Sequence, residues 1–90
     1  MAHLLVHLKV ENYSKWRTAF NNNEDFRKSS GAVGTPQVFR SGNDPWEVMV
    51  LMEWDELERA RQFAGSDELR EAMRQAGVTG QPEIFFLHQV

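Results

Sequence analysis

Residues 46–54 of this 90-residue chain read WEVMVLMEW, and this stretch decides the fold. Successive side chains of a β-strand point to opposite faces of the sheet. Five apolar side chains share the first face: Trp46, Val48, Val50, Met52 and Trp54. Two more, Met49 and Leu51, share the second. Apolar residues on both faces predict a strand near the centre of a sheet, covered on both sides.

Three further strands surround this stretch. Alternation of polar and apolar residues predicts strands over residues 2–10, 35–41 and 82–90. A dense run of turn residues, 41–45, separates the second strand from residues 46–54. These two strands therefore form a hairpin.

Helical spacing of apolar residues predicts one helical region after the first strand and another after the third. Asn12 or Ser14 can cap the first region, and Gly31 ends it. Asp55 can cap the second region, and Ser66 caps it again after an interruption.

The order β-α-β-β-α-β is the ferredoxin-like pattern of α+β proteins. Right-handed crossovers give an antiparallel four-stranded sheet of order 4-1-3-2, with both helical regions on one face. Pro36 and Pro82 then fall in the edge strands, where a missing backbone N–H is tolerated. Residues 1–90 are expected to form this one domain.

The second face of the sheet has nothing in the chain to cover it. The chain has no cysteine, and a domain of 90 residues has a thin core. Oligomerisation is a usual remedy for a small domain. We therefore expect a homodimer in which two copies pack through their sheet faces.

Composition narrows the possible partners. The net charge is −3 and the basic residues are scattered, which argues against nucleic acid as a partner. No stretch is apolar enough to span a membrane, and the N-terminal residues do not resemble a signal peptide. A cytoplasmic location is expected. The sequence contains none of the strong motifs for nucleotide binding, zinc hydrolysis or serine hydrolysis.

The whole chain resembles the dimeric α+β barrel superfamily, in particular its antibiotic-biosynthesis-monooxygenase-like and "cyclase"-labelled members. The segments that carry the resemblance are residues 3–10 (HLLVHLKV), Tyr13-x-x-Trp16-x-x-x-Phe20, residues 27–32 (RKSSGA), Phe39-Arg40 with Asp44-Pro45, Glu53-Trp54-Asp55, residues 60–63 (ARQF), residues 66–70 (SDELR) and Ala76-Gly77-Val78.

The resemblance implies a pocket between the helices and the sheet, and activities that include cofactor-free oxygenation, haem degradation, cyclisation and isomerisation. Members that degrade haem are marked by an Asn, a Trp and a His. Here His7, Phe63 and Met73 stand near those positions. The resemblance therefore does not extend to haem degradation, and neither a cofactor nor a metal is expected.

Three residues are candidates for catalysis. His7 could act as a general base, or it could be a core or interface histidine with a hydrogen-bonding partner. Arg27 could stabilise an oxyanion, or it could pair with Glu53 or cap a helix end. Glu53 could act as a base if desolvated, or it could be exposed at a strand end.

Four residues are candidates for substrate binding. Tyr13, Trp16 and Trp54 could line an aromatic pocket for a planar compound, or they could be ordinary core residues. Asn23 lies in the apolar arc of the first helical region, where a buried amide needs a partner. It could donate a hydrogen bond into the pocket, or it could lie at the wet edge of the helix.

Three functions remain compatible with the sequence. The first is a cofactor-independent monooxygenase that acts on aromatic or polyketide-like small molecules. The second is a non-catalytic dimeric module that binds a small ligand or a partner protein. The third is a cyclase or isomerase of the same fold. Convergence of His7, Asn23 and Arg27 on one cavity would favour an enzyme.

Overall fold

The computed structural model describes all residues 1–90. Its elements, in chain order, are β1 (Ala2–Val10), α1 (Tyr13–Asn22), α2 (Glu24–Ser30), β2 (Ala32–Arg40), β3 (Glu47–Trp54), α3 (Leu57–Ala64), α4 (Asp67–Gln75) and β4 (Val78–His88).

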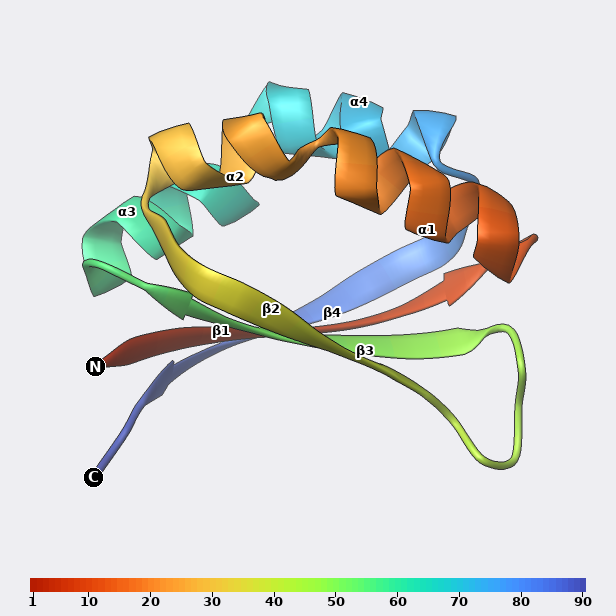
Figure 1. Cartoon of the computed structure of the whole chain (residues 1–90), viewed down its shortest axis with the longest axis horizontal. Coiled ribbons are helices and arrows are strands. Elements are labelled where there is room, and N and C mark those ends of the chain that lie inside the picture. The colour runs from red at the N-terminus through yellow and green to blue at the C-terminus, as the bar shows by residue number, and fades with distance from the viewer.

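The four strands form one antiparallel sheet in the order β2-β3-β1-β4. All four helices lie on the same face of this sheet, and the opposite face is open (Figure 1). The α+β ferredoxin-like fold and the strand order 4-1-3-2 predicted from the sequence are both confirmed. No helix is long and apolar enough to cross a bilayer.

The core lies between the helices and the two central strands. Even-numbered residues of β1 and β3, such as Leu4, Val6, Val48 and Val50, are buried under the helices. Odd-numbered residues of the same strands face the other side of the sheet, because side chains alternate along a strand. This parity decides which side chains can reach a site beneath the helices.

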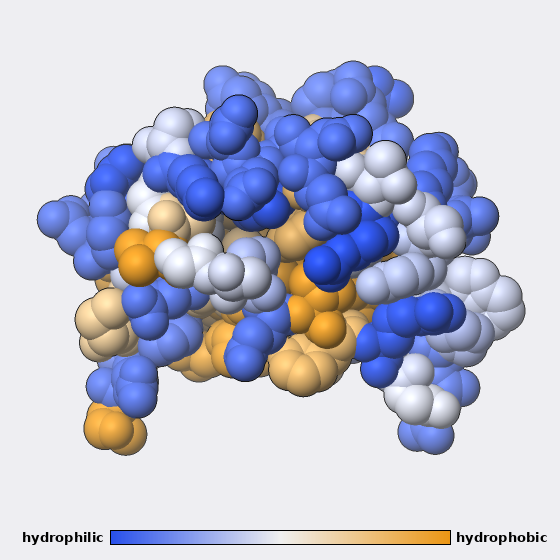
Figure 2. Space-filling model, viewed as in Figure 1, coloured by the Kyte–Doolittle hydropathy of each residue, from blue (hydrophilic) through white to orange (hydrophobic).

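The open face of the sheet carries large apolar side chains. Leu5 on β1 lies between Leu51 on β3 and Phe85 on β4. Five large apolar residues of this face are more than a third exposed: Val33, Phe39, Met49, Phe85 and Leu87. Figure 2 shows the contrast, with hydrophilic residues over the helices and hydrophobic ones gathered along the sheet.

Trp46 departs from the prediction. It was expected on the buried face of the third strand, but β3 begins at Glu47 and Trp46 is 57% exposed. The side chain of Asp44 accepts a hydrogen bond from the Trp46 backbone N–H, and the Asp44 carbonyl accepts one from Glu47. These bonds extend the turn by one residue and turn the indole outward.

Both edge strands begin earlier than predicted, at Ala32 and Val78. Gly34 and Gly80 have the same positive φ of 70°, and each stands two residues before a proline. The pairing register shifts in both strands near these glycines. The Gly-x-Pro pattern therefore marks an irregular beginning of each edge strand, which the sequence predicted to begin only at residues 35 and 82.

The helix caps are partly as predicted. Asn12 and Ser66 accept hydrogen bonds from the backbone N–H groups of Lys15 and Leu69, as N-caps do. The prediction for Asp55 is wrong, because α3 begins after Glu56 and the Asp55 carboxylate instead pairs with Arg59.

The first helical region is not continuous. It breaks at Asn23, which is both the C-cap of α1 and the N-cap of α2. The backbone there has φ −98° and ψ 13°, outside the helical range. The break places Asn23 and the residues around it above the centre of the sheet, where the cavity lies.

Candidate functional site

A cavity of about 310 Å³ lies between the helices and the sheet. Twelve of its 16 lining residues are hydrophobic. The walls come from α1, α2, α3, α4 and the even-numbered positions of β1 and β3. The lining residues are Val6, Leu8, Trp16, Ala19, Phe20, Asn22, Asn23, Arg27, Val50, Met52, Phe63, Leu69, Ala72, Met73, Gln75 and Ala76.

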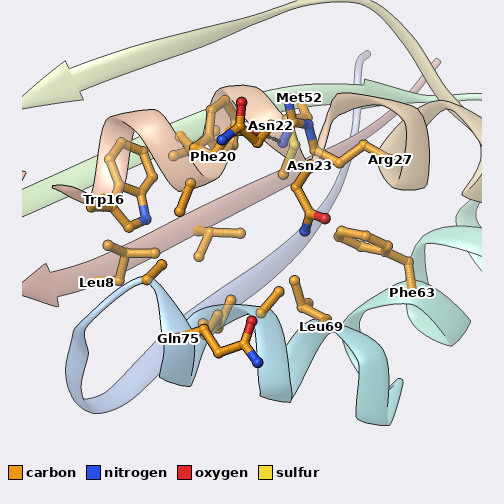
Figure 3. A pocket seen from close by; sticks show the side chains of 16 residues that line it. Leu8, Trp16, Phe20, Asn22, Asn23, Arg27, Met52, Phe63, Leu69 and Gln75 are labelled. Atoms are coloured by element: carbon orange, nitrogen blue, oxygen red, sulfur yellow. Dashed lines mark hydrogen bonds between the residues drawn. The ribbon is translucent and has the colours of Figure 1, made fainter. Parts of the chain in front are cut away.

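Trp16 and Phe20 form the aromatic wall of the cavity. Their rings are stacked, with centroids 5.0 Å apart and an angle of 25° between the planes. Trp16 is buried, and both side chains come from α1, one turn apart. Figure 3 shows Phe63 and Leu69 on other parts of the cavity wall. A flat apolar ring could pack on these surfaces.

Arg27 is the only charged residue of the lining and the only buried charged residue of the chain. Its guanidinium stacks on Phe20, with Cζ 3.7 Å from the ring centroid, and Nη1 donates to the Phe20 carbonyl oxygen at 2.5 Å. The ion pair with Glu53 considered from the sequence is absent, because Glu53 faces His3 instead. Arg27 therefore contacts the last turn of α1, as the helix-cap alternative proposed.

The surroundings of Arg27 disfavour its charge. Burial lowers the pKa of the guanidinium, the charge of Glu24 acts in the opposite direction, and the charge of Arg17 lowers the pKa further. Glu24 does not neutralise Arg27 by direct contact, since its carboxylate pairs with Lys28 at 3.0 Å. A buried cation without a carboxylate partner destabilises the folded protein, so Arg27 is a candidate for a functional role.

Asn23 is half-buried and lines the cavity. Figure 3 shows its amide directed into the space between Phe63 and Leu69, on the same side of the cavity as Arg27. Of the two alternatives weighed from the sequence, the geometry agrees with the pocket-facing one. Asn22 and Gln75 complete the polar part of the lining.

His7 does not reach the cavity. It lies on the open face of the sheet, where Nδ1 is 3.0 Å from a Glu83 carboxylate oxygen and Nε2 contacts Glu47. Hydrogen bonds to Glu83 and Glu47 raise the pKa of His7 above its ordinary value of 6.5, while burial opposes this. His7 is therefore held by carboxylate partners on the face of the sheet away from the cavity.

Three other candidates also lie outside the cavity. Glu53 is on the open sheet face, with a carboxylate oxygen 4.0 Å from His3. Trp54 is fully buried beneath the helices, and its indole N–H donates to the Ser30 carbonyl at 3.0 Å. Tyr13 is the first residue of α1, and the Arg40 Cζ atom lies 4.4 Å from its ring centroid.

Strand parity is the signal that separates these residues. The even-numbered positions of β1 and β3 face the cavity side, so His7 and Glu53, at odd positions, must face the other way. The sequence also predicted nothing for Phe20, Met73 or Gln75 as lining residues. Their helical spacing identifies the buried face of each helix. It does not show which part of that face borders the cavity.

The cavity offers hydrogen-bond donors but no base. Arg27 is its only ionisable side chain, and a guanidinium stays protonated at neutral pH. No group of three or more His, Cys, Asp or Glu residues in the chain could hold a metal ion. The site can therefore hold a planar compound and stabilise negative charge on it, but it cannot accept a proton from it.

No protein-family model matches the sequence, and no curated protein matches it in a sequence comparison. Solved structures do match. A protein from Bordetella bronchiseptica, proposed to be an antibiotic biosynthesis monooxygenase, has a TM-score of 0.82 at 13% identity, over 99% of this chain and 96% of that one. A protein with the same proposed assignment from Caulobacter crescentus has a TM-score of 0.75 at 20% identity, over 99% of this chain and 89% of that one.

A third structure is SnoaB, a cofactor-independent oxygenase from Streptomyces nogalater. Its TM-score is 0.71 at 13% identity, over 99% of this chain and 94% of that one. The likeness spans nearly all of each chain. The protein therefore has the fold of the antibiotic-biosynthesis-monooxygenase-like proteins, as the resemblance in its sequence predicted.

Proposed function

We propose that this chain binds a planar, mainly aromatic small molecule in the cavity between its helices and sheet, and oxygenates it without a bound cofactor. The observation that carries the proposal is an apolar cavity with one buried cation, Arg27, on its wall. Ligand pockets typically combine apolar walls with a few placed polar groups. The fold shared with SnoaB, a cofactor-independent oxygenase, supports the choice of reaction.

The apolar and the polar lining residues have different tasks in this proposal. Trp16 and Phe20 pack against the flat face of the ligand. Arg27 and Asn23 hold an oxygen atom of the ligand at the polar side of the cavity. The walls exclude water from the remainder of the ring system.

The reaction must begin from a substrate anion, because no lining side chain accepts a proton. An activated methylene compound that loses one proton to water gives a carbanion, whose charge Arg27 stabilises through the conjugated oxygen. The carbanion donates electrons to dioxygen, a carbon–oxygen bond forms, and the resulting peroxide anion takes one proton back from water to give a hydroperoxide. Loss of water breaks the oxygen–oxygen bond, so R₂CH₂ and O₂ give R₂C=O and H₂O. The substrate supplies every electron that dioxygen receives.

Oxygen uptake with a hydroxyanthrone tests this proposal. The expected result is one molecule of quinone formed per molecule of oxygen consumed, above the rate in buffer. Met73→Trp fills the cavity from α4 and should abolish the excess rate. Glu68→Trp adds the same side chain on the exposed side of α4 and should leave the rate unchanged. Equal rates for the wild type and Met73→Trp would contradict the proposal.

The missing base favours a second candidate, a binding protein without catalysis. A ligand held by Arg27 and Asn23 needs no proton transfer. Ligand binding that Met73→Trp abolishes, without oxygen uptake for any compound that binds, would select this candidate over the oxygenase.

We also propose that the protein is a homodimer through the open face of the sheet. The apolar residues of this face and the thin core of a 90-residue domain support a second copy as the occupant. A sheet face also suits an isologous contact, in which the same patch serves both subunits. Sedimentation equilibrium should give a mass near twice 10.4 kDa. A monomer at micromolar concentration would contradict this.

A further inference from the structure

The charge of the cavity lining is entirely positive. Of the 16 lining residues, Arg27 alone is charged, and none is acidic. The other guanidinium near Phe20 is that of Arg17, whose Cζ atom is 5.7 Å from the ring centroid but which lies outside the lining. Glu24, the acidic residue whose charge acts on Arg27, pairs with Lys28. The electrostatic potential inside the cavity therefore favours an anion.

Arg27 keeps hydrogen-bonding capacity that the protein does not use. Only Nη1 donates to a protein acceptor, the Phe20 carbonyl. No buried side-chain nitrogen in the chain lacks a partner, so Nε and Nη2 each keep some accessible surface. These two nitrogens form one edge of the planar guanidinium, the edge that binds the two oxygens of a carboxylate in parallel.

We infer that the cavity selects aromatic carboxylates, bound as monoanions with the carboxylate on the free edge of Arg27 and the ring on Trp16 and Phe20. This inference rests on the proposed binding function and narrows its ligand class. It does not depend on whether oxygenation follows.

Because the cavity contains no base, it distinguishes a carboxylate, which arrives ionised, from a phenol, which arrives neutral. A phenol titrates near pH 10, as tyrosine does, and therefore enters the cavity neutral. No lining residue can remove its proton. A carboxylic acid titrates near pH 4 and is already an anion in neutral water. Only the carboxylate therefore brings the charge that offsets the buried guanidinium.

The size of the cavity also limits the ligand. At about 310 Å³ it lies at the small end of the range for ligand pockets, roughly 300–1,000 Å³. A compact fused-ring acid fits this space better than an extended chain of rings. The half-buried Asn23 amide can donate a further hydrogen bond to the same ligand.

Three naphthalene compounds of nearly equal shape test the inference by isothermal titration calorimetry at pH 7: 2-naphthoate, 2-naphthamide and 2-naphthol. The expected result is that naphthoate binds the wild type about 10- to 100-fold more tightly than either neutral compound, the range of a charge-assisted hydrogen-bonded pair. Arg27→Met should remove this preference. Arg27→Lys should keep part of it, because lysine carries the charge without the planar fork.

Arg17→Met is the matched control. Arg17 is the other cation near Phe20, but it does not line the cavity. Its removal should change naphthoate affinity by less than about threefold. Far-ultraviolet circular dichroism verifies that each variant is folded. If Arg27→Met is not folded, the comparison of wild type with Arg27→Lys tests the inference.

The outcomes are distinct. Equal affinity of the wild type for all three compounds would overturn the carboxylate inference while leaving the aromatic cavity intact. Retained preference for naphthoate in folded Arg27→Met would also overturn it. Failure of every compound to bind would overturn the proposed binding function itself.

Discussion

The guanidinium of Arg27 lies against the ring of Phe20 and also donates a hydrogen bond to the carbonyl of the same residue. This double contact fixes one face and one edge of the guanidinium and leaves the Nε–Nη2 edge without a protein acceptor. The Phe20 carbonyl does not depend on Arg27, because the backbone N–H of Asn23 donates to it at 3.2 Å. Arg27 is therefore positioned by the fold more than it supports the fold.

Replacing Arg27 with Met should change the free energy of unfolding by less than about 1 kcal/mol. The loss of a cation–π contact and a hydrogen bond is offset by the removal of an unpaired buried charge. Urea denaturation at one fixed protein concentration measures this. A loss of more than about 2 kcal/mol would show that Arg27 is mainly a structural residue.

Replacing Leu5 with Lys should separate the proposed dimer into monomers. Leu5 lies at the centre of the open face between Leu51 and Phe85, so a second sheet packed there would bury the ammonium without a partner. Sedimentation velocity should show the smaller species at micromolar concentration with unchanged circular dichroism. Gln62→Lys introduces the same charge on the exposed surface of α3 and should remain dimeric. Dimeric Leu5→Lys would place the interface elsewhere.

The pairing of His7 with Glu83 and Glu47 predicts a pH-dependent contribution to stability. The folded pKa of His7 is raised above 6.5, so the stabilisation is fully present below pH 6.5 and is lost as the pH rises through the folded pKa. The free energy difference between the wild type and His7→Gln should be about 1 kcal/mol at pH 6, the scale of a partly exposed charged hydrogen bond, and smaller at pH 9. Urea denaturation at both pH values measures it.

Glu83→Gln provides the control for this pH effect, since Glu83 contributes most to the raised pKa of His7. When both proteins carry Glu83→Gln, the effect of His7→Gln on the free energy of unfolding should depend less on pH. The other charged groups of this face, His3, Lys9 and Glu53, are unchanged in every variant compared. A difference that grows toward pH 9 would contradict the assigned sign.

The sequence predicts the central strands better than the ends of the elements. Apolar alternation in β1 and β3 reports burial under the helices, which is a strong and regular signal. The exposure of Trp46 depends instead on a hydrogen bond from its backbone N–H to the Asp44 carboxylate, which alternation does not reveal. The break of the first helical region at Asn23 has no glycine or proline to mark it.

The candidate site was predictable in part for the same reason. Trp16, Asn23 and Arg27 share one face of the predicted helical region, and all three line one cavity although the helix breaks at Asn23. His7 and Glu53 were chosen for their chemistry, and their odd strand positions put them on the far side of the sheet. The volume of the cavity depends on how the four helices pack over the sheet, which residue spacing alone does not determine.

Replacing Gly31 with Ala should destabilise the protein by about 2–4 kcal/mol, because the chain reverses there between α2 and β2 with φ +123°. A β-carbon at this position would stand 2.6 Å from the Asp55 carboxylate and 2.7 Å from the Trp54 indole nitrogen. Gly42→Ala is the control: nothing lies within 4 Å of its β-carbon position, so its effect should stay within about 0.5 kcal/mol. Urea denaturation of the two variants measures the difference. Equal midpoints would mean that the turn at Gly31 can relax, and that the buried Trp54 is held in place by other contacts.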